Sequence, residues 1–116
     1  MKDYEGKVTY KEKEYKLVFN INVMEAIQEE YGTLEKWTEL TSGVNQEANA
    51  KAIKFGYTEM INEGLAIEAD EKGTEYVPVT KAFVGRMLTE IGLDNMAKSL
   101  QNTVIESTKT DDGKNV

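Results

Sequence analysis

The stretch that decides the fold runs from Leu17 to Leu40 and reads LVFNINVMEAIQEEYGTLEKWTEL. It begins as a strand, because Leu17 and Phe19 share one face of an alternating pattern. At Asn22 the apolar spacing changes from two residues to 3.6, which predicts a helix with Asn22 as its N-cap. Glu25 stands where the partner residue of a capping box would lie. The stretch therefore predicts a strand that leads directly into a helix.

Two helices follow from the same stretch. Gly32 ends the first one, because glycine readily adopts the left-handed backbone of a helix C-terminus, and Thr33 caps a second, short helix. Ile21 and Ala26 occupy the two positions of a hydrophobic staple. The apolar arcs of the two helices consist of Val23, Met24, Ile27 and Tyr31, and of Leu34, Trp37 and Leu40. This unit contains no chemistry of its own.

Residues 4–19 predict a β-hairpin. Val8 and Tyr10 alternate with polar residues in the first strand, as do the apolar residues of the second. The charged residues 11–14 predict a four-residue turn. An isolated two-stranded hairpin is marginal in water, so its apolar face is expected to pack on the helices.

Three more helices are expected. The longest spans about residues 46–69, with Asn45 as its cap; the next starts after Thr80 and ends at Gly92; the last spans about residues 95–107 and is capped by Asp94. The apolar stripe of the longest helix consists of Ile53, Gly56, Tyr57, Met60, Ile61, Gly64 and Ile67. Its two glycines predict places where a neighbouring element approaches closely.

The expected fold class is therefore α+β and predominantly helical, with an N-terminal β-hairpin packed on four or five α-helices. Residues 1–107 are expected to form a single domain, which suits a chain of 116 residues. Residues 70–79 form a loop with some extended character. Residues 108–116 contain one apolar side chain and are expected to be a flexible C-terminal tail.

Composition excludes several functional classes. The chain has no Cys and no His, which removes disulfides, thiol nucleophiles, Cys/His zinc sites and imidazole catalysis. The formal net charge of −7 repels phosphate backbones, so a nucleic-acid partner is not expected. No signal peptide or membrane span is recognisable, and the expected location is the cytoplasm.

Three motifs could carry chemistry, and each has a feature that opposes it. The helical carboxylates lie on outward faces and predict no converging catalytic pair. Residues 70–73 resemble the start of a calcium loop, but Lys72 takes a ligand position and Lys81 takes the position of the essential Glu. The turn before Asp94 could belong to a DNA-reading helix pair, but Glu106 and the net charge oppose that reading. The sequence therefore predicts no enzyme, no cofactor and no metal.

Four blocks of sequence lie between about residue 7 and residue 107: Tyr15–Asn22 at the end of the hairpin; Glu29–Leu34 at the end of a Glu-rich helix; Phe55-Gly56-Tyr57 in the long helix; and Val79-Thr80 followed by Val84-Gly85 and Ile91-Gly92-Leu93. Through these blocks the chain resembles the tail assembly chaperones of long-tailed bacteriophages and prophages. These blocks consist of hydrophobic spacing and helix punctuation rather than catalytic residues.

The resemblance implies a non-enzymatic assembly factor. Such a protein binds the tape measure protein, holds it in solution, helps to recruit tail tube subunits and is absent from the finished virion. It acts in the cytoplasm of the host cell, and self-association is possible. The resemblance supplies no catalytic residue and no cofactor.

Three apolar residues are candidates for contact with such a partner. Phe55 lies nearly opposite the stripe of the longest helix; it either packs on a further element, such as the hairpin or the short helix, or is exposed to a partner. Trp37 and Ile105 lie at the edges of their arcs and belong either to the core or to the contact surface.

A different class of function stays open. The chain could be a small phage or bacterial regulatory or adaptor module that binds a host protein. Gene context separates the two hypotheses, because a tail assembly chaperone is expected between the genes of a major tail protein and a very long tape measure protein.

Overall fold

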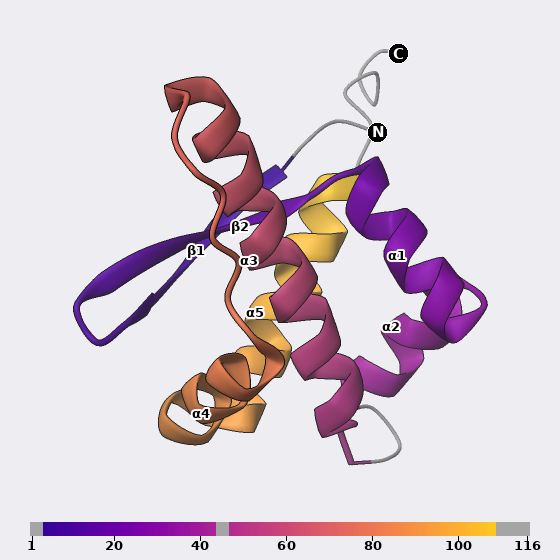
Figure 1. Cartoon of the computed structure of the whole chain (residues 1–116). Coiled ribbons are helices and arrows are strands. Elements are labelled where there is room, and N and C mark those ends of the chain that lie inside the picture. The colour runs from indigo at the N-terminus through magenta and orange to yellow at the C-terminus, as the bar shows by residue number, and fades with distance from the viewer. Residues whose placement is uncertain (1–3, 44–46, 109–116) are drawn as a thin grey trace.

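The computed structural model describes residues 4–43 and 47–108 of the chain. Within these residues an antiparallel hairpin precedes a series of helices (Figure 1). The elements are β1 (Tyr4–Tyr10), β2 (Lys13–Phe19), α1 (Ile21–Tyr31), α2 (Leu34–Ser42), α3 (Ala50–Lys72), α4 (Lys81–Ile91) and α5 (Leu93–Thr108). This arrangement confirms the expected α+β, mainly helical fold class. The expected flexible tail lies outside the described residues, apart from the end of α5.

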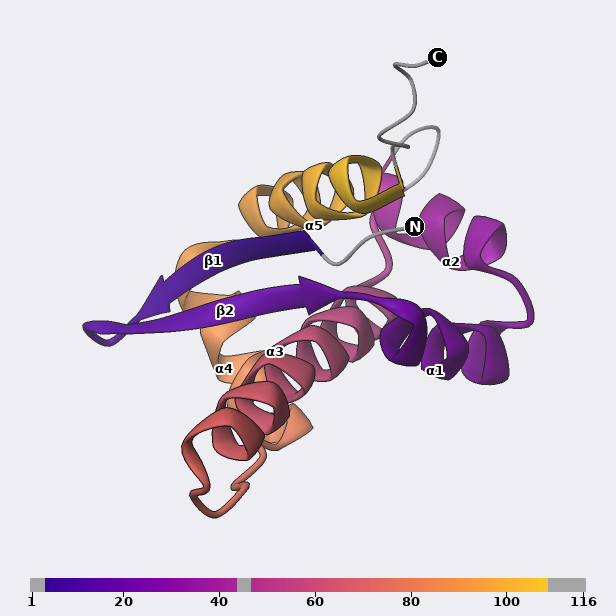
Figure 2. The same cartoon turned by 90° about the horizontal axis from the view of Figure 1, so that it is seen from above.

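The hairpin lies between α3 on one side and α5 on the other (Figure 2). Helices α1 and α2 pack against each other and against α3 at the end of the molecule away from the hairpin turn. Phe83 of α4 holds the turn end of the hairpin, where its ring meets those of Tyr10 and Tyr15 edge to face at 5.5 and 6.0 Å. The expectation that the hairpin packs on the helices is confirmed.

The hairpin turn is shorter than expected. Tyr10 pairs with Lys13, so the turn consists of Lys11 and Glu12 alone, with φ angles of 52° and 65°. Two positive φ angles are the hallmark of the type I′ turn, whose twist matches that of the flanking strands. The expected four-residue turn was wrong because the ladder continues through Lys13 to the end of β1.

Helix α1 begins two residues before the expected position. Asn20, not Asn22, is the N-cap, and its Oδ1 accepts a hydrogen bond from the backbone N–H of Val23 at 3.2 Å. Both asparagine side chains donate to one carboxylate oxygen of Glu63 on α3, at 2.8 and 3.1 Å. Ile21 is 61% exposed, so the expected hydrophobic staple is absent. Gly32 ends α1 and Thr33 caps the start of α2, as expected.

The bounds of α3 and α5 also differ from the expected ones. Asn49 caps α3 by accepting the N–H of Ala52 at 2.9 Å, whereas the expected cap, Asn45, lies outside the described residues. Gly73, with a φ of 67°, ends α3 three residues later than expected. Asp94 lies inside the first turn of α5 and is not its cap. Thr80 and Gly92 bound α4 as expected.

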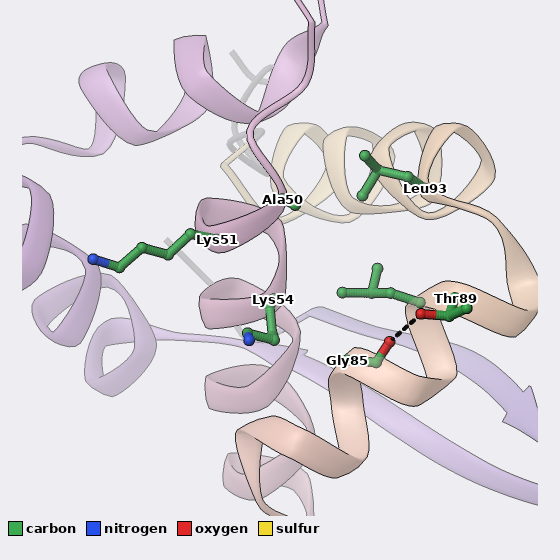
Figure 3. Close-up of a pocket in the computed structure, with 7 residues that line it drawn as sticks. Ala50, Lys51, Lys54, Gly85, Thr89 and Leu93 are labelled. Atoms are coloured by element: carbon green, nitrogen blue, oxygen red, sulfur yellow. Dashed lines mark hydrogen bonds between the residues drawn. The ribbon is translucent and has the colours of Figure 1, made fainter.

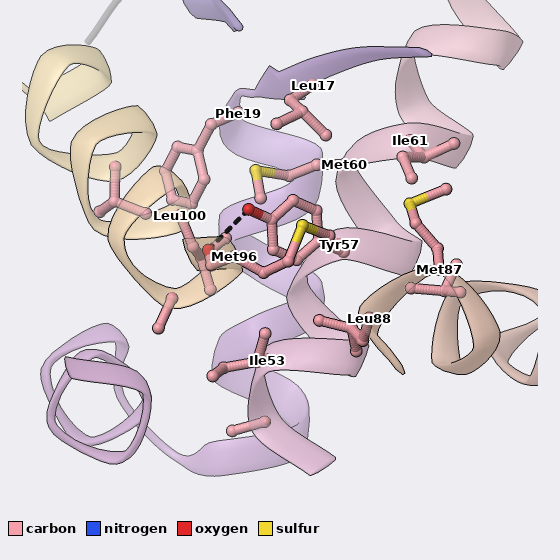
Figure 4. Close-up of a cluster of buried hydrophobic side chains, with 14 of the residues drawn as sticks. Leu17, Phe19, Ile53, Tyr57, Met60, Ile61, Met87, Leu88, Met96 and Leu100 are labelled. Carbon is pink, nitrogen blue, oxygen red and sulfur yellow. Dashed lines mark hydrogen bonds between the residues drawn. The ribbon is translucent and has the colours of Figure 1, made fainter. Parts of the chain in front are cut away.

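Helix α3 is the centre of the core. Its predicted stripe is buried, except that Ile67 is partly exposed. Side chains of β2, α4 and α5 meet this stripe from different directions, among them Leu17, Phe19, Met87 and Leu100 (Figure 4). Tyr57 donates its hydroxyl proton to the carbonyl of Met96 at 2.7 Å, which satisfies a buried polar group and ties α3 to α5.

Two glycines of α3 allow the close approaches that the sequence predicts. A Cβ atom on Gly56 would lie 2.4 Å from Cζ2 of the Trp37 indole, and one on Gly64 would lie 3.1 Å from the backbone carbonyl oxygen of Lys16. Helix α2 therefore packs directly on the α3 backbone at Gly56, and β2 crosses α3 at Gly64.

An extended segment returns along α3 from its C-terminal end to the start of α4 (Figure 1). Asn62 anchors it: its side-chain amide donates to the carbonyl of Val79 at 3.2 Å, and its Oδ1 accepts the N–H of Val79 at 2.8 Å. The amide thus imitates one rung of a β-ladder. Between Gly73 and Val79 every residue is exposed, including Tyr76 and Val77.

We expect Gly56→Ala to lower the free energy of unfolding by about 1–2 kcal/mol. The new methyl group meets an atom of the rigid, buried Trp37 ring, so the cost of overpacking should lie at about 2–3 kcal/mol, which exceeds the gain of about 1 kcal/mol in helix propensity. The matched control is Gly85→Ala in α4, where a Cβ atom meets nothing closer than the Lys54 Cδ at 3.5 Å. This variant should be more stable than wild type. Urea unfolding measures the free energy of unfolding of both variants. A change of the same sign in Gly56→Ala and Gly85→Ala would contradict the packing argument.

Burial raises the pKa of Tyr57 to about 12 from an ordinary value of 10.0, against a smaller opposing effect of a hydrogen bond with Ser99. The folded state thus holds the phenol proton more tightly than the unfolded state. The resulting stabilisation is complete below about pH 10 and is lost as the pH rises towards about 12. Over this range the free energy of unfolding should fall more steeply for wild type than for Tyr57→Phe. Parallel pH profiles would show that Tyr57 does not contribute.

Candidate functional site

Trp37 lies in the core. Its side chain is fully buried, its ring packs on the backbone of Gly56, and its indole N–H donates to the carbonyl of Ala52 at 3.0 Å. Because the ring surface is covered and the N–H is hydrogen-bonded inside the fold, this side chain is not exposed for contact with a partner. Of the two roles for Trp37 that the sequence leaves open, the structure shows the core position.

Phe55 is half-buried and packs on two elements that the sequence did not indicate. Its ring meets that of Tyr31, at the end of α1, edge to face at 5.6 Å, and the Nζ of Lys81 lies 5.3 Å from the ring centroid. Burial, together with the Glu30 carboxylate, raises the pKa of Tyr31. Phe55 therefore connects α3 to α1 and α4, rather than to the hairpin or to α2.

Ile105 is exposed, with half of its surface accessible. It lies in an open depression of about 460 Å³ between α2 and α5, which we call the α2–α5 groove. The lining residues are Leu34, Glu35, Thr38, Glu39, Ser42, Gln101, Val104 and Ile105. Gln101 donates to the hydroxyl of the buried Thr41 at 2.7 Å, which fixes the relative position of the two helices.

The α2–α5 groove combines an apolar surface with acidic residues. Leu34, Val104 and Ile105 supply apolar surface, while Glu35 and Glu39 come from successive turns of α2. Such a groove can accept apolar side chains from one face of a helix and favours positive charge beside them.

A second depression, of about 520 Å³, lies where α3, α4 and the start of α5 meet; we call it the α3–α4 groove (Figure 3). It is lined by Ala50, Lys51, Lys54, Gly85, Leu88, Thr89 and Leu93. None of these described lining residues is a carboxylate, although the chain as a whole is acidic. Sequence reasoning did not find this groove because three helices form it; the only local signal is a glycine in the middle of α4.

Glu59 and Glu63 are carboxylates one turn apart on α3. Burial raises the pKa of Glu59, Lys81 opposes this shift, and the Glu63 carboxylate adds to it. Glu63 itself accepts hydrogen bonds from Asn20 and Asn22. Glu63 thus positions the start of α1 against α3, while Glu59 interacts electrostatically with Lys81 at the start of α4.

Metal binding and membrane insertion have no candidate in the described part of the chain. Across residues 4–43 and 47–108, no three His, Cys, Asp or Glu side chains are grouped so that they could hold a metal ion. None of the described helices has the length and apolarity needed to cross a bilayer.

No family model, curated protein or solved structure matches this chain. The resemblance to tail assembly chaperones therefore depends on the sequence blocks alone. The surface geometry leaves Ile105 and the two grooves as the candidate functional features, with Phe55 beside them as a packing residue.

The structure separates Phe55 and Ile105 by their expected effects on stability. Phe55→Ala should lower the free energy of unfolding by about 1–2 kcal/mol, because it removes a half-buried ring and an aromatic contact. Ile105→Ala should change it by less than about 0.5 kcal/mol, as is usual for exposed positions. Thermal or urea unfolding of the two variants measures the difference. A larger loss for Ile105→Ala would place that residue in the fold rather than on a binding surface.

Proposed function

We propose that this protein is a non-enzymatic tail assembly chaperone that binds helical segments of a phage tape measure protein and helps to recruit tail tube subunits. In this role it acts in the host cytoplasm and is absent from the finished virion. The observation that carries the proposal is the exposed Ile105 in the apolar, acid-flanked α2–α5 groove.

The groove has the features of helix-in-groove recognition. An amphipathic helix presents apolar side chains at i, i+3, i+4 and i+7, and a groove between two packed helices receives them. Leu34 on α2 and Ile105 on α5 provide apolar surface on opposite sides. Glu35 and Glu39 favour a segment with Lys or Arg beside its apolar stripe. A long helical protein that must be kept from aggregating offers many segments of this kind.

Gene context gives the first test. The proposal requires the gene to lie beside genes for virion assembly, between a major tail protein and a very long tape measure protein. A location among genes unrelated to virion assembly would favour the regulatory or adaptor hypothesis instead.

Co-expression gives the direct test. Wild-type protein should keep an otherwise insoluble tape measure fragment in the supernatant, and Ile105→Glu should reduce the soluble fraction several-fold because it places a charge in the apolar groove. The matched control is Ile21→Glu, which adds the same charge at an exposed isoleucine at the start of α1. This control should rescue the fragment as well as wild type does.

Circular dichroism should show that both variants fold. A fragment that stays in the pellet with wild-type protein would contradict the proposed function. Equal rescue by Ile105→Glu and wild type would exclude the α2–α5 groove as the binding surface.

A further inference from the structure

Helix α4 contains a glycine that the fold itself does not require. Glycine weakens a helix interior relative to alanine. Gly56 and Gly64 have clear reasons, since Trp37 and the β2 backbone occupy the space of their missing side chains. Gly85 has no such reason: a Cβ atom there would make only an ordinary contact, at 3.5 Å, with the Lys54 side chain.

Gly85 also does not serve a turn. It lies within α4, and the glycines with a positive φ among the described residues are those at helix ends, Gly32, Gly43, Gly73 and Gly92. Neither internal packing nor backbone conformation explains the missing side chain. Its effect is external, because it keeps open the surface of the α3–α4 groove.

The surroundings of Gly85 define what the groove can receive. The lining includes Leu93 from α5, the largely buried Leu88 from α4 and the small side chain of Ala50 from α3. Lys51 and Lys54 line the groove from the α3 side, about one turn apart, and the Lys51 side chain extends outward from α3 at the rim, away from Thr89 and Leu93 (Figure 3). Neither lysine forms an ion pair with any residue in the described part of the chain. The groove is therefore an apolar surface beside two available positive charges.

We propose that the α3–α4 groove docks an acidic amphipathic helix of a partner protein. The apolar side chains of that helix lie on Leu88 and Leu93, and its backbone approaches α4 closely at Gly85. Its Asp or Glu side chains pair with Lys51 and Lys54. This site goes beyond the proposed chaperone function, because its charge preference is opposite to that of the acid-flanked α2–α5 groove.

Charge complementarity selects this occupant. The chain carries a net charge of −7, yet among the described residues no carboxylate lines the groove, so an acidic segment meets two lysines there and no opposing charge in the lining. The two lysines would also attract the phosphates of a nucleic acid, but the remaining surface of an acidic protein repels a long phosphate backbone. The small residue at the crossing point suits a helix, because ridges of one helix approach the other most closely where a side chain is missing.

The test uses a display library of helical peptides of about 14 residues, with leucines fixed along one face and the other positions randomised. Selection on the full chain should enrich peptides with Asp or Glu flanking the leucines. Their affinity should fall by at least about tenfold in Gly85→Leu, which fills the groove, and in the double variant Lys51→Glu, Lys54→Glu. The charge-dependent part of binding should weaken as salt is added.

The matched control is Arg86→Glu, which reverses a charge at the neighbouring position on α4, outside the groove lining. It should bind the selected peptides as wild type does. Leucine is a better helix former than glycine, so Gly85→Leu should unfold at a temperature no lower than that of wild type. Amide NMR shifts on peptide addition should centre on Gly85 and Thr89.

Three results would overturn the proposal. One is a selection that yields no binder or only basic peptides. Another is unchanged binding to Gly85→Leu, or shifts centred on the α2–α5 groove. The last is a dimer in sedimentation that Gly85→Leu dissociates, which would assign the groove to a second copy of this chain.

Discussion

The packing of the Trp37 indole on the bare backbone of α3 at Gly56 is the constraint on which the rest of the structure depends. It brings the α2 side chain closer to the α3 backbone than any side chain at position 56 would allow, and the indole hydrogen bond to Ala52 fixes the ring in place. One residue further along, Tyr57 reaches the backbone of α5. Two turns later β2 crosses at Gly64. One helix therefore sets the positions of three neighbours, and the surface grooves follow from those positions.

The spacing of apolar residues and the residues that cap or end helices were sufficient to predict most of the fold. The buried stripe of α3 and its two close approaches were readable because a glycine within an apolar stripe weakens the helix unless a neighbour needs the space. Exact helix starts were not readable, because several residues at one boundary can cap equally well. Asn20 and Asn22 are an example: the carboxylate that accepts hydrogen bonds from both belongs to Glu63, more than forty residues away. The hairpin turn was misjudged because Lys11 and Glu12 are not typical of left-handed backbone.

The candidate surface was harder to predict than the fold. Residues at the edge of an apolar arc are buried or exposed according to what the neighbouring elements cover, and a single sequence does not contain that information. Trp37 and Ile105 both lie at such edges, yet one is fully buried and the other half-exposed. Phe55 lies opposite the stripe and still packs, because α1 and α4 both reach it. The α3–α4 groove needs three helices to exist, so only Gly85 could have pointed to it.

The pairing of the Asn62 amide with Val79 has a consequence for the architecture of the chain. It fixes the entry to α4 independently of the exposed residues that precede it, while the cap of α3 at Gly73 fixes the exit from that helix. Thr74 still belongs to the end of α3, because its N–H donates to the carbonyl of Ala69 at 2.9 Å, whereas residues 75–78 are exposed. The chain can therefore be opened there and given new termini, or can carry an inserted reporter domain, while both halves keep their own attachments to the core.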